Sequence, residues 1–146
     1  MKYKIIENPD YTRKKVGITT VPYNEVLTMF LASLSVEKMP GFISACSHSS
    51  SFGVENASLR FFHEMDWEDL AQLAAVGEMK EGNVNIYVYD GKGNDIILEE
   101  RLFDEIFRGY SVKLMEICKE DETLPPHWAD DMKIALTSLS KKGRKQ

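Results

Sequence analysis

The chain has 146 residues, of which 43% are hydrophobic and 28% are charged, and this is the size and balance of one globular domain with its own core. Its net charge is −5, and no apolar run approaches the roughly 20 residues that a membrane-spanning helix needs. The N-terminus lacks the apolar central region of a secretory signal, so we expect a cytoplasmic protein without a membrane partner.

The first forty residues predict two strands followed by a helix. Residues 2–6 (KYKII) and 15–20 (KVGITT) favour extended structure because of their β-branched side chains. Pro22 and Asn24 are typical of a helix start. Apolar residues then recur at spacings of three and four, at Val26, Leu27, Phe30, Leu31 and Leu34. We expect the sequence MPG at 39–41 to end this helix, since a residue before proline avoids helical geometry.

The next segment predicts two strands and a second helix. Residues 42–48 (FISACSH) and 58–64 (SLRFFHE) are expected to be strands joined by a polar loop. Residues 66–79 predict a helix, with Asp66 as its N-cap and Asp69 three positions later, as in a capping box. Its expected buried stripe consists of Trp67, Leu70, Leu73 and Ala74.

A β-hairpin is the clearest signal in the chain. In residues 83–90 (NVNIYVYD) polar and apolar residues alternate strictly, which places Val84, Ile86 and Val88 on one face and Asn85, Tyr87 and Tyr89 on the other. Residues 91–94 (GKGN) are typical of a turn, and residues 95–100 (DIILEE) form the returning strand.

The last third of the chain is expected to be helical. A helix from Phe103 to Cys118 and a terminal helix from about Pro126 both show apolar spacings of three and four. The sequence therefore predicts an α+β fold, in which three to four helices pack on a mostly antiparallel sheet. We expect a single domain over 1–140 and a basic, disordered tail over 141–146.

The sequence HEMDWED at 63–69 raises the question of a metal site. A catalytic zinc site needs about three suitably placed ligands. In this stretch only His63, Glu64 and Asp66 could converge on one ion without special geometry. Carboxylates at a helix N-terminus are also stabilising without any metal, so we favour the interpretation as a helix cap.

Cys46 and His48 raise the question of a nucleophile. On the expected strand 42–48 they share one face, as a catalytic thiol and its base would. No orienting third group is adjacent in the sequence, so we predict no catalytic residue, no metal and no cofactor. Two cysteines, Cys46 and Cys118, are too few for a disulfide framework and are expected to be thiols.

The charge of the chain is strongly asymmetric. Between Glu64 and Asp131 there are 18 carboxylates against six Lys or Arg, a net charge of −12. Such a surface repels phosphate, which argues against nucleic acid, and attracts a basic protein. The expected binding residues are acids and tyrosines of this half: Glu64, Asp66, Glu68, Asp69, Tyr87, Tyr89, Asp95, Glu99, Glu100, Asp104 and Glu105.

The overall plan resembles the small acidic immunity proteins that neutralise nuclease toxins in bacterial contact-dependent growth inhibition. The resemblance lies in the cytosolic α+β domain, the hairpin NVNIYVYDGKGNDIILEE and the acidic, aromatic helix RLFDEIFRGYSVKLMEICKEDE. It covers most of the chain and implies a bacterial protein without enzymatic activity. Such a protein binds its cognate basic toxin domain and blocks the active site or substrate surface of the toxin.

Two other functions stay open. One is a small metal-dependent or Cys/His hydrolase that uses His48, His63 or Cys46 with nearby carboxylates. The other is a dimeric adaptor or scaffold, in which exposed Phe and Tyr of the long helix pack against a second copy.

Overall fold

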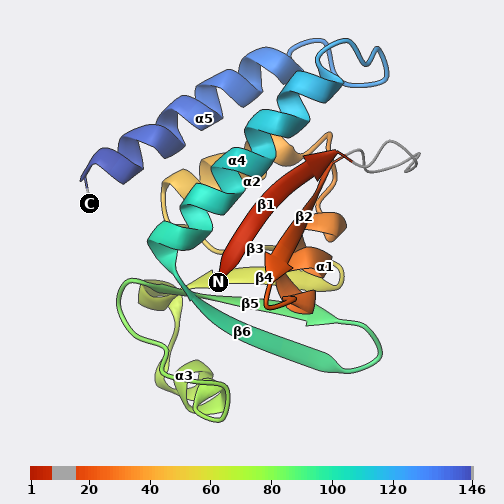
Figure 1. Cartoon of the computed structure of the whole chain (residues 1–146). Helices are drawn as coiled ribbons and strands as arrows, with labels where there is room; N and C mark the ends of the chain where they lie inside the picture. Colours follow the sequence, from red (N-terminus) through yellow and green to blue (C-terminus); the bar gives the residue numbers. More distant parts are fainter. Residues whose placement is uncertain (8–15, 146) are drawn as a thin grey trace.

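The structure, a computed structural model, describes residues 1–7 and 16–145, with side chains as far as Lys142 (Figure 1). The elements in chain order are β1 (Lys2–Glu7), β2 (Val16–Val21), α1 (Glu25–Ser33), α2 (Met39–Ser47), β3 (Phe52–Val54), β4 (Ala57–Phe61), a 3-10 turn η1 (Phe62–Glu64), α3 (Trp67–Leu73), β5 (Asn83–Tyr89), β6 (Gly93–Glu99), α4 (Glu100–Cys118) and α5 (Trp128–Lys145). The α+β class is confirmed, with five α-helices in the described residues where three to four were expected.

Two antiparallel sheets form the β part of the molecule. β1 pairs with β2, and the larger sheet has the order β3-β4-β5-β6. The predicted hairpin is confirmed as β5 and β6, which pair without interruption from Asn83↔Glu99 to Tyr89↔Gly93. Its predicted apolar face, formed by Val84, Ile86 and Val88, is at most 1% exposed. The alternation of side chains along β5 therefore fixes which face of the sheet meets the core.

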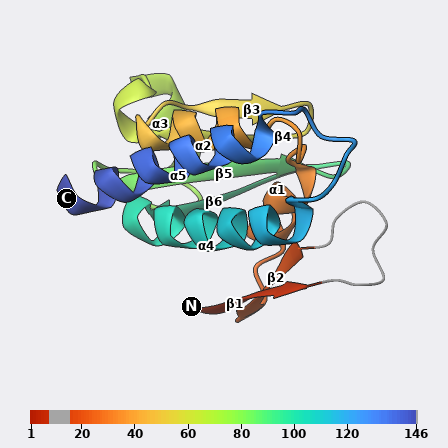
Figure 2. The ribbon, with the colours of Figure 1, turned by 90° about the horizontal axis from the view of Figure 1, so that it is seen from above.

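The helices are distributed unequally over the larger sheet. α1, α2, α4 and α5 lie on its inner face, with α5 packed on α2 and α4 (Figures 1 and 2). The β1-β2 hairpin packs against α1 and α4, and α3 projects from the end of the sheet on the opposite side (Figure 1). Among the described residues, the helices are each too short or too polar to cross a membrane.

The predicted strand at 42–48 is wrong, because residues 42–47 belong to α2 and His48 is the C-cap of that helix. The sequence MPG was expected to stop a helix, but Pro40 lies in the first turn of α2, where its missing N–H costs nothing. Met39, Ile43 and Cys46 are spaced by four and three and are fully buried. This helical period decides the conformation of a short apolar run that periodicity over a few residues leaves ambiguous.

Other element boundaries differ by a few residues. α1 is capped by Asn24 as predicted, since its side chain accepts from Leu27 N–H at 3.0 Å, but Pro22 lies ahead of the helix. The strand expected at 15–20 is β2, and Lys15 lies outside the described residues. β3 occupies part of the expected polar loop, and the strand expected at 58–64 ends at Phe61.

The C-terminal helix continues through the stretch for which the sequence predicts a disordered tail. α5 extends to Lys145, while Gln146 and the side chains of 143–145 lie outside the described part. The Lys142 side chain is only 8% exposed. Its Nζ lies 3.1 Å from Glu100 Oε2, 3.0 Å from Asp104 Oδ2 and 2.9 Å from the Cys46 carbonyl oxygen. Lys142 thus holds the end of α5 against α2 and α4.

The charges around Lys142 affect each other's protonation. Burial lowers the pKa of Lys142, but the attraction of the surrounding negative groups, Asp104 and Glu100 among them, outweighs burial and raises the pKa. Burial raises the pKa of Asp104, although Lys142 opposes that shift. Lys142 therefore stays charged at neutral pH and balances two carboxylates whose side chains are 14% and 12% exposed.

We expect Lys142→Met to destabilise the fold by about 3–5 kcal/mol, because removing one partner of a buried ion pair leaves carboxylates without a counter-charge. Urea denaturation followed by circular dichroism measures the loss. Lys141→Met is the matched control, since Lys141 is exposed and its replacement should change the free energy of unfolding by no more than about 0.5 kcal/mol. Equal stability of the two variants would contradict a structural role for Lys142.

Candidate partner-binding surface

Residues 62–82 form an excursion between two neighbouring strands, and we call this segment the acidic arm. It leaves the sheet at the end of β4, contains η1 and α3, and returns at the start of β5 (Figure 1). Its charged residues are one lysine, Lys80, and six carboxylates: Glu64, Asp66, Glu68, Asp69, Glu78 and Glu81. The arm thus places a strong excess of negative charge on a small projection of the molecule.

Three of the predicted binding residues of the arm also hold it in shape. The capping box is confirmed, since Asp66 Oδ1 accepts from Asp69 N–H at 2.9 Å and Asp69 Oδ2 accepts from Asp66 N–H at 3.1 Å. A cap of this kind contributes about 1 kcal/mol to a helix. Glu64 accepts a hydrogen bond from Ser51 N–H, which lowers the pKa of Glu64 and keeps the carboxylate charged.

A chain of polar contacts fastens α3 to the outer face of the sheet. Asp69 lies 3.3 Å from Arg60 on β4, and Arg60 Nε donates to Asn85 Oδ1 on β5 at 3.1 Å. The Asn85 amide then donates to Asp95 Oδ1 on β6 at 3.0 Å. Asp69 and Asp95 are therefore partly occupied by contacts within the protein. Asn85 is fully buried although it lies on the outer face, because its polar atoms are satisfied by these neighbours.

The orientation of α3 differs from the predicted one. Leu73 is 2% exposed and Leu70 is half-buried, as expected for a buried stripe. Trp67 is 76% exposed and Ala74 is exposed, so the prediction that both pack inward is wrong. Only one side of the helix meets the sheet, and the contact between Asp69 and Arg60 fixes which side that is.

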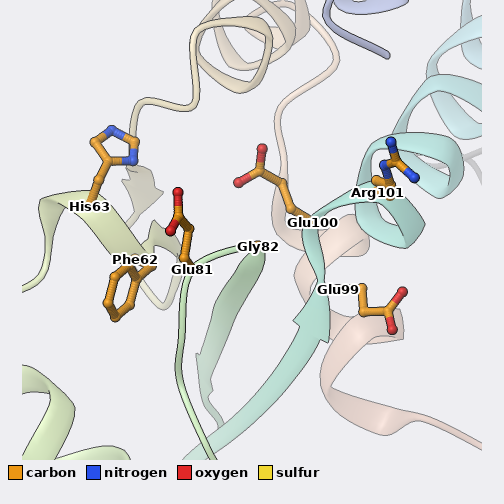
Figure 3. A pocket seen from close by; sticks show the side chains of 7 residues that line it. All are labelled: Phe62, His63, Glu81, Gly82, Glu99, Glu100 and Arg101. Carbon is orange, nitrogen blue, oxygen red and sulfur yellow. The ribbon is translucent and has the colours of Figure 1, made fainter. Parts of the chain in front are cut away.

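A cleft of about 720 Å³ lies where the two ends of the arm meet the junction of β6 and α4. It is lined by Phe62, His63, Glu81, Gly82, Glu99, Glu100 and Arg101. Figure 3 shows that His63, Glu81 and Glu100 point into the same space, while Glu99 is directed away from it. Glu81 and Glu100 supply negative charge to the cleft and Arg101 supplies positive charge, and Glu100 is already paired with Lys142.

Sequence reasoning missed Phe62, Glu81 and Arg101 as lining residues. The cleft joins three separate stretches of chain, 62–63, 81–82 and 99–101, and no local motif connects them. The pairing of the strands accounts for their proximity. Phe61 is aligned with Val84, and Val84 with Leu98, so the residues just beyond these pairs are neighbours at one end of the sheet.

The predicted tyrosines and Asp95 lie elsewhere, on the outer face of the sheet. Tyr87 and Asp95 are direct register partners and line a shallow depression of about 300 Å³ beside α3. The Tyr87 ring lies over Gly93, where an added Cβ would be only 2.9 Å from Cε2, so a larger residue there would displace the ring. Tyr89 is 49% exposed at the end of the strand.

Two of the three predicted binding residues on α4, Asp104 and Glu105, do not share a surface with each other. Asp104 lies inside the protein, 9% exposed, and faces Lys142. Glu105 accepts a hydrogen bond of 2.7 Å from the Tyr3 hydroxyl on β1. Burial, together with this contact, raises the pKa of Tyr3 to about 12. The structure therefore brings Glu99 and Glu100 next to the arm and separates Asp104 and Glu105 from it.

The geometry opposes the Cys/His interpretation. Positions two apart on a helix diverge by about 200°, so Cys46 and His48 lie on opposite sides of α2. Cys46 is fully buried and lies 3.2 Å from Asp104, while His48 is exposed and its Nδ1 is 2.8 Å from the Ser44 carbonyl oxygen. Within the residues that the structure describes, no group of three His, Cys, Asp or Glu side chains is placed to hold a metal ion.

The aromatic residues of α4 are buried, whereas the dimer hypothesis requires them to be exposed. Phe103 and Phe107 are fully buried and Tyr110 is 2% exposed. Phe103 and Phe107 stack on each other with their ring centroids 5.2 Å apart. These side chains belong to the core of one chain, so they cannot form the contact between two copies that was expected of them.

Comparison with known proteins gives a structural neighbour. The sequence matches no family model and no curated protein. In structure, the chain is similar to an immunity protein from Neisseria meningitidis MC58, with a TM-score of 0.53 and 12% sequence identity. The match covers 77% of this chain and 85% of that protein. At this level of identity the similarity shows a shared fold.

We expect Cys46 to be unreactive in the folded protein. Burial raises the pKa of the Cys46 thiol well above its usual value, with Asp104 adding to the shift, so almost no thiolate forms at neutral pH. A Cys118→Ser chain treated with an aromatic disulfide reagent should react only as urea unfolds it. Rapid reaction of the native chain, slowed by His48→Ala, would instead restore the nucleophile hypothesis.

Proposed function

We propose that this chain is an immunity-type protein that binds a basic toxin domain and blocks its active site or substrate surface. The observation that carries the proposal is the shared fold with a protein described as an immunity protein. The acidic arm is a second, independent support, because a projection with six carboxylates and one lysine suits a cationic protein surface.

The docking surface that we propose consists of the acidic arm and the adjoining cleft. Glu68, Glu81 and Glu99 are exposed there and are free to meet lysines or arginines of the partner. Glu64 and Asp66 contribute charge to the same region while they hold its shape, whereas Asp69 and Glu100 mainly hold its shape, because they are paired with Arg60 and Lys142. Tyr87, Tyr89 and Asp95 on the outer face extend the surface beyond α3.

The mechanism of neutralisation would be occlusion supported by electrostatics. A nuclease holds its substrate through lysines and arginines that contact phosphate groups. Carboxylates of the arm would pair with these residues and exclude RNA or DNA from them. Pairs at the rim of such an interface mainly accelerate association, whereas enclosed pairs determine which toxin is recognised. The acids of the arm would therefore set the rate of association with the toxin, and the cleft would determine which toxin is recognised.

The residues assigned to α4 need a different role in this proposal. Asp104 neutralises Lys142 inside the protein, so it would support the cleft by fixing Glu100 rather than touch the toxin. Glu105 lies beside Tyr3, away from the arm, and would contribute only to the long-range field.

The test is co-production of this chain with a toxic domain, sought first among the products of neighbouring open reading frames. We expect growth to be restored and a complex to be isolated. The double variant Glu68→Lys/Glu81→Lys should lower the association rate at low salt by at least about tenfold, because it reverses the steering charge. Glu120→Lys/Glu122→Lys, an equal exposed reversal between α4 and α5, is the matched control and should have a much smaller effect.

Two results would contradict the proposal. Growth arrest that persists despite soluble, folded chain would remove the immunity function for that toxin. Equal association rates for the Glu68→Lys/Glu81→Lys variant and the Glu120→Lys/Glu122→Lys control would keep the function but place the docking surface elsewhere.

A further inference from the structure

The outward side of α3 is apolar, and nothing in the described structure covers it. Trp67, Leu70, Ala71 and Ala74 follow the spacing of three and four that defines one side of a helix. Trp67 is 76% exposed, Ala71 and Ala74 are exposed, and Leu70 is half-buried. This is the periodic stripe that in most helices faces the core, and here it faces away from it.

The arm is built to keep this side outward. α3 has only seven residues, and a helix of this length is not stable in water by itself. It is held from the other side by buried Leu73, by the contact of Asp69 with Arg60 and by its capping box. Rotation that buried Trp67 would break the contact between Asp69 and Arg60 and expose Leu73. Trp67 is therefore exposed because the contacts on the opposite side of α3 fix the orientation of the helix.

Charge complementarity indicates what the exposed side contacts. Asp66 and Glu68 flank Trp67 directly in the chain, and Glu64 precedes them on η1. Across a two-fold axis these acids would face their own copies, and like charges oppose that contact. Phosphate would be repelled in the same way. A protein surface with an apolar recess ringed by Lys or Arg satisfies both the indole and the carboxylates, and Arg also stacks favourably on tryptophan.

We propose that the exposed side of α3, centred on Trp67, is the anchor of the complex and inserts into an apolar recess of the basic toxin domain. This inference rests on the proposed function and names the residue that supplies most of its affinity. Tryptophan is among the residue types enriched at positions where truncation weakens binding most, and these positions lie near the centre of an interface, surrounded by contacts that exclude water.

The first experiment measures the affinity of the toxin domain identified by co-production for Trp67→Ala. We expect the dissociation constant to rise by about 30-fold or more, the effect of losing a central anchor. The melting temperature of the free chain should not fall, since Trp67 supports no core contact. Ile134→Ala is the matched control, because Ile134 is 68% exposed on α5 and should leave the affinity unchanged. Trp67→Phe should retain part of the affinity.

The second experiment uses the fluorescence of the same tryptophan. Trp128 is 3% exposed and its Nε1 donates to the Val36 carbonyl oxygen at 2.7 Å, so acrylamide should quench Trp67 and spare Trp128. Binding of the toxin domain should protect Trp67 and shift its emission to shorter wavelength. The Trp67→Phe chain supplies the signal of Trp128 alone.

The outcomes separate this inference from the proposed function. A complex that forms with unchanged affinity for Trp67→Ala, and in which Trp67 stays open to acrylamide, overturns the anchor and leaves the function standing. No complex with the toxin domain overturns both. Sedimentation that shows a dimer of the free chain, lost in Trp67→Ala, would overturn the toxin as occupant and assign the face to a second copy.

Discussion

The polar contacts that cross the outer face of the sheet determine how the rest of this surface is arranged. Asp69, Arg60, Asn85 and Asp95 come from α3, β4, β5 and β6 in turn, so one line of contacts connects the arm to three strands. Asn85 lies in the middle of this series of contacts and is fully buried, so leaving its amide without a hydrogen-bond partner would cost about 1–3 kcal/mol of stability. The orientation of α3, and with it the exposure of Trp67, follows from this constraint.

The carboxylates fall into two groups, one with partners inside the protein and one that faces solvent. Glu100 and Asp104 compensate the buried ammonium of Lys142, and Asp66 and Asp69 cap α3, so these four have partners within the protein. Other acids, such as Glu68, face solvent and set the field that a partner meets. A net charge counted along the sequence treats the two groups alike. Glu100 and Asp104 are balanced by Lys142, whereas the exposed acids, Asp66 included, are available to steer a cationic protein.

The shared fold and the surface carry different kinds of information. A fold of this plan needs periodic apolar residues in the right order, and many sequences meet that requirement, which is why two chains with 12% identity share it. Partner choice depends on individual side chains such as Trp67 and Glu81, which the fold leaves free to vary. The proposed function therefore rests on the arm and cleft of this chain as well as on its architecture.

The sequence by itself determined what local periodicity and local hydrogen bonds control: the hairpin of β5 and β6, the helices α4 and α5, the Asn24 cap and the capping box of Asp66 and Asp69. The tertiary structure decided the conformation of 42–48, the side of α3 that meets the sheet, and the cleft formed by three distant stretches. The physical reason is the range of the interactions. Spacing along a chain shows that a helix has an apolar side, but which side is covered depends on partners such as Arg60 that only the folded chain brings near.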